Sequence, residues 1–207
     1  MDILVTIFSL VILLFSVIIH ELAHGYVANS LGDPTAKYQG RLTLNPIKHL
    51  DPFGSVILPL MLFFIGSPVL VGWAKPVPIN PYNFTDQKWG TLKVSLAGPA
   101  TNITLAIIFG LILRFIPLAV FTAMPGLLII FSFVVQINIM LAIFNLVPIP
   151  PLDGHWILFK LIPAQYENVK AFLSQYGVFL LIFFIFFGGL QFLAGITGYV
   201  FHIITGI

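Results

Sequence analysis

The sequence predicts an all-α, polytopic membrane protein, and two features of its composition carry that prediction. Of the 207 residues, 59% are hydrophobic and only 8% are charged, whereas soluble domains carry about 25% charged residues. The mean hydropathy is also strongly positive, at +1.06. Because these few polar side chains cannot cover the surface of a globular protein in water, we expect lipid around most of the surface. We predict about four to five transmembrane helices, a re-entrant segment and a small β-like loop near residues 37–45.

Four stretches are long and apolar enough to cross the hydrocarbon core, which takes about 20 residues per helix. These stretches cover residues 3–31, 91–115, 126–147 and 174–204. The last one contains Gly188 and Gly189, which favour a break in a helix. Two forms of this segment are therefore open, namely one long span or a span followed by an interfacial helix.

The chain is interpreted as one integral-membrane domain over residues 1–207, with a core at 3–155 and a helical tail at 165–207. Cysteine is absent, which excludes disulfides and thiolate metal ligands. The net charge is only +2, and no basic patch with interleaved aromatic residues indicates a nucleic-acid partner. The expected surroundings are therefore the lipid bilayer, and the sequence does not indicate an oligomeric state.

A shorter apolar run at residues 55–71 contains two prolines and is expected to enter the bilayer and return on the same side. With this topology only Arg114 lies on the opposite face, and the other eight basic residues share one face: Lys37, Arg41, Lys48, Lys75, Lys88, Lys93, Lys160 and Lys170. This distribution follows the positive-inside rule and places the shared face in the cytoplasm of a cell membrane. The N-terminus is then extracytoplasmic.

The first predicted helix contains an H-E-x-x-H motif at His20, Glu21 and His24. Because positions i and i+4 share one face of a helix, both imidazoles can bind one metal ion. Glu21 is rotated by about 100° from His20, so it can act as a general base without binding the metal. Ionisable side chains inside a membrane helix are costly, which favours a functional role over a chance match.

A catalytic zinc ion needs a third protein ligand and an open position, and Asp153 is the candidate. It follows the third long span in a proline-rich segment, whose extended backbone is tolerated at membrane depth only beside a cavity. The alternative role is an N-cap for the helix that begins near Gly154. Helix direction favours the ligand role, because His20 and His24 lie near the C-terminal end of the first span and both spans run inward.

In this order, these residues resemble the paired signatures of the site-2 protease family of intramembrane zinc metalloproteases. The second signature is carried by Asn145, Pro148 and the pair Asp153-Gly154. Residues 97–102, Ala-Gly-Pro-Ala-Thr-Asn, are similar to a third and weaker signature on the helix between the two. No segment resembles a PDZ or CBS domain, which is typical of the compact prokaryotic branch.

The resemblance covers about residues 14–160 and implies an activity and a cofactor. It implies one catalytic Zn²⁺ ion bound by His20, His24 and Asp153, with Glu21 as the catalytic base. It also implies hydrolysis of peptide bonds in or near the transmembrane segments of membrane-protein substrates.

Two asparagines are predicted to lie on the active-site face, at Asn102 and Asn145. Each offers an amide donor to the substrate or to the oxyanion of the reaction, and the alternative for each is a hydrogen bond between helices. Residues 37–45 are expected to offer a strand edge to an unwound substrate, with a plain interfacial loop as the alternative.

Two other classes of function compete with a protease. A metal transporter also places histidine and carboxylate side chains in its spans, but it usually distributes polar groups along a path and often contains internal repeats. Here the ionisable groups cluster at one depth, and the sequence contains no repeat. A catalytically silent scaffold is the second alternative, and it has no need of the complete set His20, Glu21, His24 and Asp153.

Overall fold

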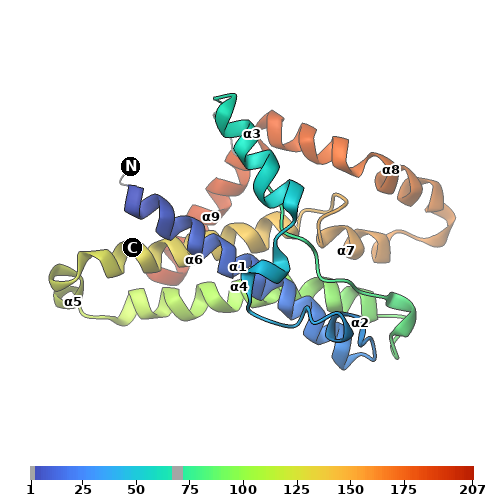
Figure 1. The fold of residues 1–207 in the computed structure, drawn as a ribbon, viewed down its shortest axis with the longest axis horizontal. Helices are drawn as coiled ribbons and strands as arrows, with labels where there is room; N and C mark the ends of the chain where they lie inside the picture. Colours follow the sequence, from blue (N-terminus) through green and yellow to red (C-terminus); the bar gives the residue numbers. More distant parts are fainter. Residues whose placement is uncertain (1–2, 67–71) are drawn as a thin grey trace.

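The computed structural model describes residues 3–66 and 72–207, and Figure 1 shows them as a bundle of long helices with irregular loops at one end. The centre consists of three long helices, α1 (Ile3–Ser30), α4 (Gly90–Phe115) and α6 (Pro125–Asn145). Helix α4 packs against both α1 and α6. Within the described ranges, four helical segments are long and apolar enough to cross a membrane. The predicted all-α membrane fold is confirmed.

Shorter helices connect the long ones, namely α2 (Thr35–Tyr38), η1 (Pro46–His49), η2 (Pro52–Ile57), α3 (Leu58–Phe64), η3 (Pro81–Asn83), α5 (Leu118–Ala123), α7 (Gly154–Leu161) and η4 (Ala164–Tyr166). Three of them begin with the same kind of N-cap. The side chains of Asn45, Asp51 and Asn80 each accept a hydrogen bond from a backbone N–H of the first turn. A proline follows each of these caps, where its missing N–H costs nothing.

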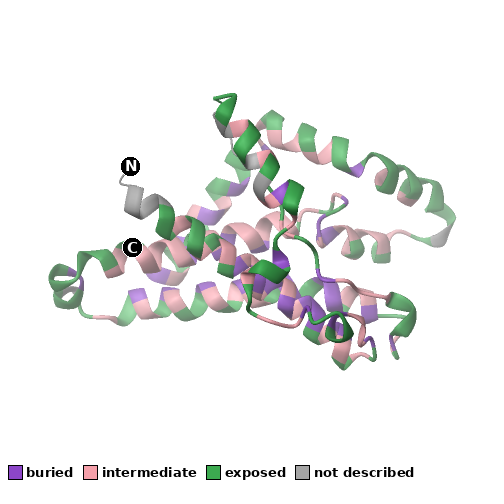
Figure 2. Ribbon diagram, viewed as in Figure 1, coloured by how far each residue is buried: buried purple, intermediate pink, exposed green. Residues whose placement is uncertain are grey.

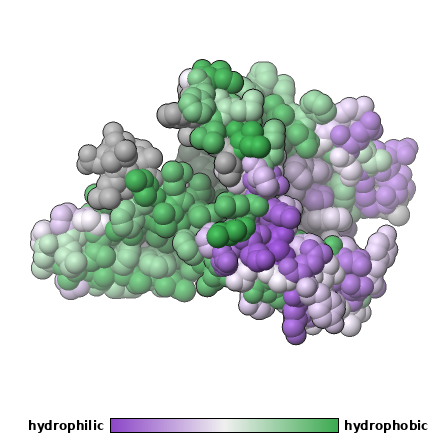
Figure 3. Space-filling model, in the orientation of Figure 1, coloured by the Kyte–Doolittle hydropathy of each residue, from purple (hydrophilic) through white to green (hydrophobic). Residues whose placement is uncertain are grey.

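Helices α1 and α6 run in the same direction, and α4 runs against them (Figure 1). The C-terminal ends of α1 and α6 therefore lie at the same end of the bundle. Figure 3 shows that the most hydrophilic residues gather at this end, whereas most of the other coloured surface is hydrophobic. Lys93 lies in the first turn of α4 at this end, and Arg114 lies in the last turn at the other.

The segment expected to be re-entrant leaves and returns at the same place. The backbone N–H of Trp73 donates to the carbonyl of Gly54 at 3.2 Å, and Leu50 forms an antiparallel bridge with Ala74. Since the two ends of the excursion are bonded to each other, the segment begins and ends at the same end of the bundle. Residues 67–71 of this segment lie outside the described residues.

The prediction of a β-like loop near residues 37–45 is wrong. Thr35–Tyr38 instead forms the single helical turn α2. Gly40 follows it with φ at +61°, and the N–H of Arg41 bonds to the carbonyl of Ala36 at 2.9 Å. This hydrogen bond across six residues, with a glycine at positive φ inside it, is the Schellman motif that commonly ends a helix. The turn therefore uses the backbone groups that a strand edge would have offered.

The last apolar segment is broken, as the two glycines suggested. Helix α8 (Glu167–Phe184) is followed by a π-helical turn, η5 (Ile185–Gly189), and then by α9 (Leu190–Thr205). Within that turn Gly188 has φ at +92°, a conformation that costs residues with a Cβ atom about 1–2 kcal/mol. Figure 1 shows that α8 and α9 point in different directions. Helix α9 packs against α4 and α6.

The interior of the bundle contains a large apolar cluster and a polar region. The apolar cluster draws on α4, α5, α6 and α9 and consists of Ala106, Leu113, Phe121, Val135, Ile139 and Phe201. The polar region lies between α1, α4 and α6, and its buried side chains are Ser16, His20, His24, Asn102 and Asn138. Figure 2 shows buried residues on the facing sides of these helices and exposed residues on their outer sides.

Candidate metal centre

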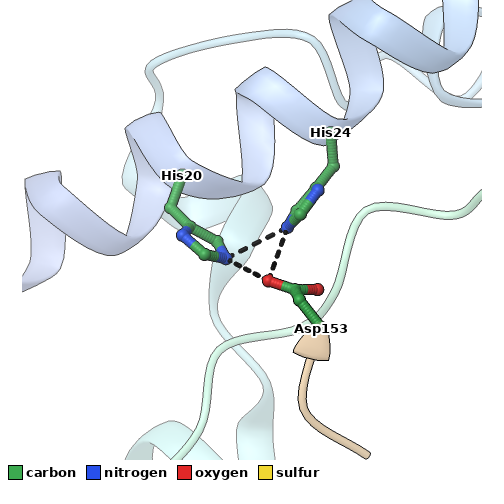
Figure 4. A group of neighbouring side chains, drawn as sticks. All are labelled: His20, His24 and Asp153. Atoms are coloured by element: carbon green, nitrogen blue, oxygen red, sulfur yellow. Dashed lines mark hydrogen bonds and ion pairs between the residues drawn. The ribbon is translucent and has the colours of Figure 1, made fainter. Parts of the chain in front are cut away.

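Three donor atoms from two distant parts of the chain converge at the polar end of the bundle (Figure 4). His20 and His24 lie one turn apart on α1, and their Nε2 atoms are 3.0 Å from each other. One carboxylate oxygen of Asp153, Oδ2, lies 3.1 Å from Nε2 of His20 and 3.3 Å from Nε2 of His24. Within the described residues these three form the group of side chains that could hold a metal ion.

The hydrogen bonds behind the rings show why a cation fits this place. Nδ1 of His24 lies 2.7 Å from the carbonyl oxygen of Val94, which can only accept, so Nδ1 carries the proton of the neutral ring. The Nε2 lone pair therefore faces the other donor atoms. Oδ2 of Asp153 is buried and has no hydrogen-bond donor. Lone pairs and a carboxylate at this separation repel each other unless a cation lies between them.

The separations of the donor atoms agree with a zinc ion. Zinc binds histidine nitrogen and carboxylate oxygen at about 2.0–2.2 Å, almost always tetrahedrally, which places pairs of ligand atoms about 3.3 Å apart. The observed separations are 3.0, 3.1 and 3.3 Å. Two histidines and one carboxylate also form a ligand set that is typical of catalytic zinc, because the fourth position stays open.

Asp153 does not act as the N-cap that was considered as its alternative role. It directly precedes α7, but its backbone is already helical and its side chain makes no capping hydrogen bond. The carboxylate instead points to the two histidines (Figure 4). The parallel direction of α1 and α6 therefore brings the candidate ligands together, as the sequence predicted.

Glu21 lies beside the three donor atoms but is not one of them. Its Oε2 accepts a hydrogen bond of 2.8 Å from the backbone N–H of Val77. This bond holds the carboxylate at the wall of a cavity of about 310 Å³ that the metal group also lines. The arrangement leaves Oε1 available to a water molecule or substrate in the cavity.

The two predicted asparagines have different surroundings. Asn145 lines the cavity, and its Nδ2 donates to the carbonyl of Leu141 one turn earlier at 2.9 Å. Asn102 is fully buried behind His20, and its Oδ1 lies 2.5 Å from Nδ1 of that ring. Its Nδ2 is also bonded within the protein, to Asn138. Asn102 is therefore not free to contact a substrate, and the expected substrate or oxyanion role does not fit it.

Gly98 on α4 makes room for both imidazoles. A Cβ atom at this position would lie 2.5 Å from Nε2 of His20 and 2.5 Å from Nε2 of His24. Real Cβ atoms do not come this close to a neighbouring atom, so any larger residue would displace the rings. Gly98 belongs to the weaker third signature, but nothing in the sequence indicated this role for it.

The wall of the cavity that carries Val77 is held by two buried ionisable side chains. Nη2 of Arg41 donates to the carbonyls of Lys75 and Pro76, at 2.8 and 3.2 Å. Asp33, which follows α1, accepts from the backbone N–H of Asn80 at 2.7 Å. Neither side chain lines the cavity, but together they hold the extended segment that donates to Glu21.

The pKa of Asp33 follows from the same contacts. Burial by itself would raise the pKa of this carboxyl, but hydrogen bonds from Thr35, Asn80 and Asn83 outweigh it and hold the pKa below the ordinary value. These hydrogen bonds favour the charged form because an ionised carboxylate only accepts. Asp33 is therefore a charged anchor for the segment after α1.

Comparison with known proteins gives several relatives. Peptidase family M50 matches residues 119–184, a range that includes Asp153. The "Putative zinc metalloprotease YwhC" of Bacillus subtilis is 43% identical over 85% of this chain and 80% of its own length. The "Putative zinc metalloprotease Rip2" of Mycolicibacterium smegmatis is 30% identical over 82% of this chain and 62% of its own length.

An archaeal relative, the "Putative zinc metalloprotease MJ0611" of Methanocaldococcus jannaschii, is 36% identical over 76% of this chain and 72% of its own length. No solved structure matches the chain. The names of the relatives indicate zinc as the cofactor, in agreement with the donor atoms of His20, His24 and Asp153. The chain therefore belongs to peptidase family M50, the site-2 protease family that its sequence motifs resemble.

Proposed function

We propose that the protein is an intramembrane zinc metalloprotease that hydrolyses peptide bonds in or near the transmembrane segments of membrane proteins. One observation carries the proposal: two histidines and a carboxylate converge within 3.3 Å inside a helical bundle, and a second carboxylate, Glu21, lines the same cavity. A purely structural zinc site is closed by four protein ligands and needs no neighbouring base.

Each of these side chains has a distinct role in the proposed reaction. His20, His24 and Asp153 would hold the zinc ion, which when bound supplies Lewis-acid polarisation of the scissile carbonyl. Glu21 takes a proton from the attacking water and later delivers it to the leaving amine. The N–H of Val77 holds Oε2 of Glu21 at 2.8 Å, so the carboxylate stays at the wall of the cavity. Asn145, at the same cavity, offers an amide to the substrate backbone.

The position of the site in the bundle supports a cleavage point near the cytoplasmic end of a substrate helix. Eight of the nine basic residues belong to the loops and helix ends near the metal centre, and Arg114 lies at the other end of α4. We place the metal end in the cytoplasm by the positive-inside rule. The chain has no cysteine, so single cysteines at positions 37 and 75 can be tested with an impermeant thiol reagent. Labelling of these positions from opposite faces would contradict this topology.

The decisive test of the proposed activity compares the wild type with Glu21→Gln in membranes that contain a single-span candidate substrate. Glutamine keeps the size of the side chain but cannot take a proton. We expect cleavage by the wild type, a loss of at least about 100-fold in the variant, and equal zinc content in both.

Two controls separate the base from the metal in this test. His24→Asn should lose both cleavage and zinc, because it removes a proposed ligand. Equal cleavage by the wild type and by Glu21→Gln would sink the protease assignment, and vesicles that accumulate zinc without any cleavage would favour the transporter instead.

A further inference from the structure

A chain of buried hydrogen bonds runs from helix α6 to the metal centre. Nδ2 of Asn138 donates to the carbonyl of Val134 at 2.8 Å and to Oγ of Ser16 at 3.0 Å. Oδ1 of Asn138 accepts from Nδ2 of Asn102 at 2.7 Å. Oδ1 of Asn102 in turn lies 2.5 Å from Nδ1 of His20. The chain therefore links α6, α4 and α1.

The direction of every bond in this chain is determined at its α6 end. A backbone carbonyl can only accept, so the amide group of Asn138 that faces Val134 must be the NH₂ group. The Oδ1 atom of Asn138 then faces Asn102, whose NH₂ group must point to it. This leaves Oδ1 of Asn102 facing His20, and an oxygen in that position requires a proton on Nδ1 of the ring.

The position of this proton decides whether His20 can bind a metal. A neutral imidazole carries one proton, so a proton on Nδ1 leaves the lone pair on Nε2, the atom that faces Asp153 at 3.1 Å. If the Asn102 amide were reversed, its NH₂ group would face Nδ1 and the proton would move to Nε2. His20 would then present an N–H group to the metal position.

We propose that Asn138 is a positioning residue that sets the tautomer of His20 through Asn102 and so prepares Nε2 for zinc. This inference rests on the proposed ligand role of His20. Asn138 and Asn102 are both fully buried, and neither lines the cavity. Burying two amides in membrane helices costs free energy unless every polar atom is paired. Here the hydrogen bonds that pair them also determine which nitrogen of His20 carries the proton.

The chain offers a matched set of variants. Asn138→Leu has a similar size but removes the acceptor at 2.7 Å, so the Asn102 amide keeps only a long contact of 3.4 Å to the carbonyl of Ser16 and its orientation is held weakly. Asn138→Asp retains an acceptor for Asn102, and in its protonated form it donates to Val134 as the amide does. Gln136→Leu removes an exposed amide from the same helix and is the control for the loss of polarity.

The direct readout is the nitrogen NMR spectrum of histidine-labelled, metal-free protein at a pH where the rings are neutral, with the His20 signals assigned by their loss in His20→Asn. In the wild type we expect the proton of His20 on Nδ1, and a proton on Nε2 would overturn the proposal without any variant of Asn138. Asn138→Leu should show a mixture of tautomers, whereas Asn138→Asp and Gln136→Leu should resemble the wild type.

Zinc affinity, measured by competition with a chelator, is the second readout. We expect Asn138→Leu to bind zinc at least tenfold more weakly, since residues that orient a ligand typically contribute 10–100-fold. Asn138→Asp should recover most of the affinity, and Gln136→Leu should not change it. Wild-type affinity in Asn138→Leu would refute the role of Asn138. Wild-type affinity in His20→Asn would instead refute the ligand set of the proposed function.

Discussion

Nε2 of His20 lies 3.1 Å from Oδ2 of Asp153, although 133 positions separate the two residues in the chain. The contact exists because α1 and α6 run in the same direction, so that a residue near the end of α1 meets one that follows α6 (Figure 1). The excursion between Gly54 and Trp73 makes this possible, since a full crossing there would have reversed α6 relative to α1.

Replacement of Asp153 by alanine should remove zinc from the purified protein. The variant loses a carboxylate that faces both histidines and leaves only two neutral ligands, which do not form a stable zinc site. We expect less than a tenth of the wild-type zinc content by elemental analysis. Glu167→Ala removes an exposed carboxylate that pairs with Lys170 and should retain the full content. Wild-type zinc in Asp153→Ala would exclude Asp153 as a ligand.

Gly98→Ala should damage the metal centre although glycine is not a ligand. The added methyl group would lie 2.5 Å from Nε2 of both His20 and His24, so the rings must move away from the common ligand position. We expect zinc affinity to fall at least tenfold, as measured by chelator competition. At Gly195, also within a helix, a Cβ atom meets no atom within 4 Å, so Gly195→Ala is the matched control and should bind zinc normally.

The stability contributed by Asp33 should depend on pH in a defined direction. The folded-state pKa of this carboxyl is lowered, so its stabilising effect is complete above the unfolded pKa of about 3.9. It is lost as the pH falls through the lower folded-state pKa. We expect Asp33→Ala to unfold at a lower temperature than the wild type at pH 7, by about 2 kcal/mol or more in free energy, because several buried donors lose their charged acceptor.

The difference between the melting temperatures of wild type and Asp33→Ala should shrink below about pH 4, where Asp33 of the unfolded chain becomes protonated, and it should vanish below the lower folded-state pKa. A difference that grows with acidity would have the wrong sign for an anchoring carboxylate. Glu167→Ala again serves as the exposed control and should change the melting temperature little at any pH.

Arg41→Met should slow cleavage without removing zinc. Methionine keeps part of the apolar stem but cannot donate to the carbonyls of Lys75 and Pro76, which Nη2 of Arg41 now bonds. The segment that presents Val77 to Glu21 loses this support, so the base is held less well. We expect a roughly tenfold lower cleavage rate, the equivalent of about 1.4 kcal/mol, with unchanged zinc content.

The exposed Lys37 lies close to Arg41 in the chain, and Lys37→Met is the control for the lost positive charge. It should cleave at the wild-type rate. Zinc loss in Arg41→Met would show that Arg41 supports the ligands themselves rather than the wall of the cavity.

Hydropathy and charge predicted the membrane fold and the returning segment, because a backbone in lipid can adopt few conformations. For the last apolar segment the sequence left one long span and a broken span open, and the structure decided for the break at Gly188. A backbone in hydrocarbon must satisfy its own hydrogen bonds, so long apolar runs become helices whatever surrounds them. The pairing of His20 and His24 was also predictable, because the i and i+4 positions of one helix always share a face. The approach of Asp153 followed from counting helix directions.

Only the tertiary structure decided the roles of residues whose partners lie on other helices. For Asn102 the sequence left open a substrate role and a hydrogen bond between helices, and its packing behind His20 decided for the second. Asn138 drew no attention in the sequence, although a buried amide in a span is itself a signal. The hydrogen bond to Glu21 comes from the backbone N–H of Val77, so no side chain in the sequence indicates it. Such roles depend on which atoms face each other across the bundle, and that is determined by packing rather than by the pattern along any one helix.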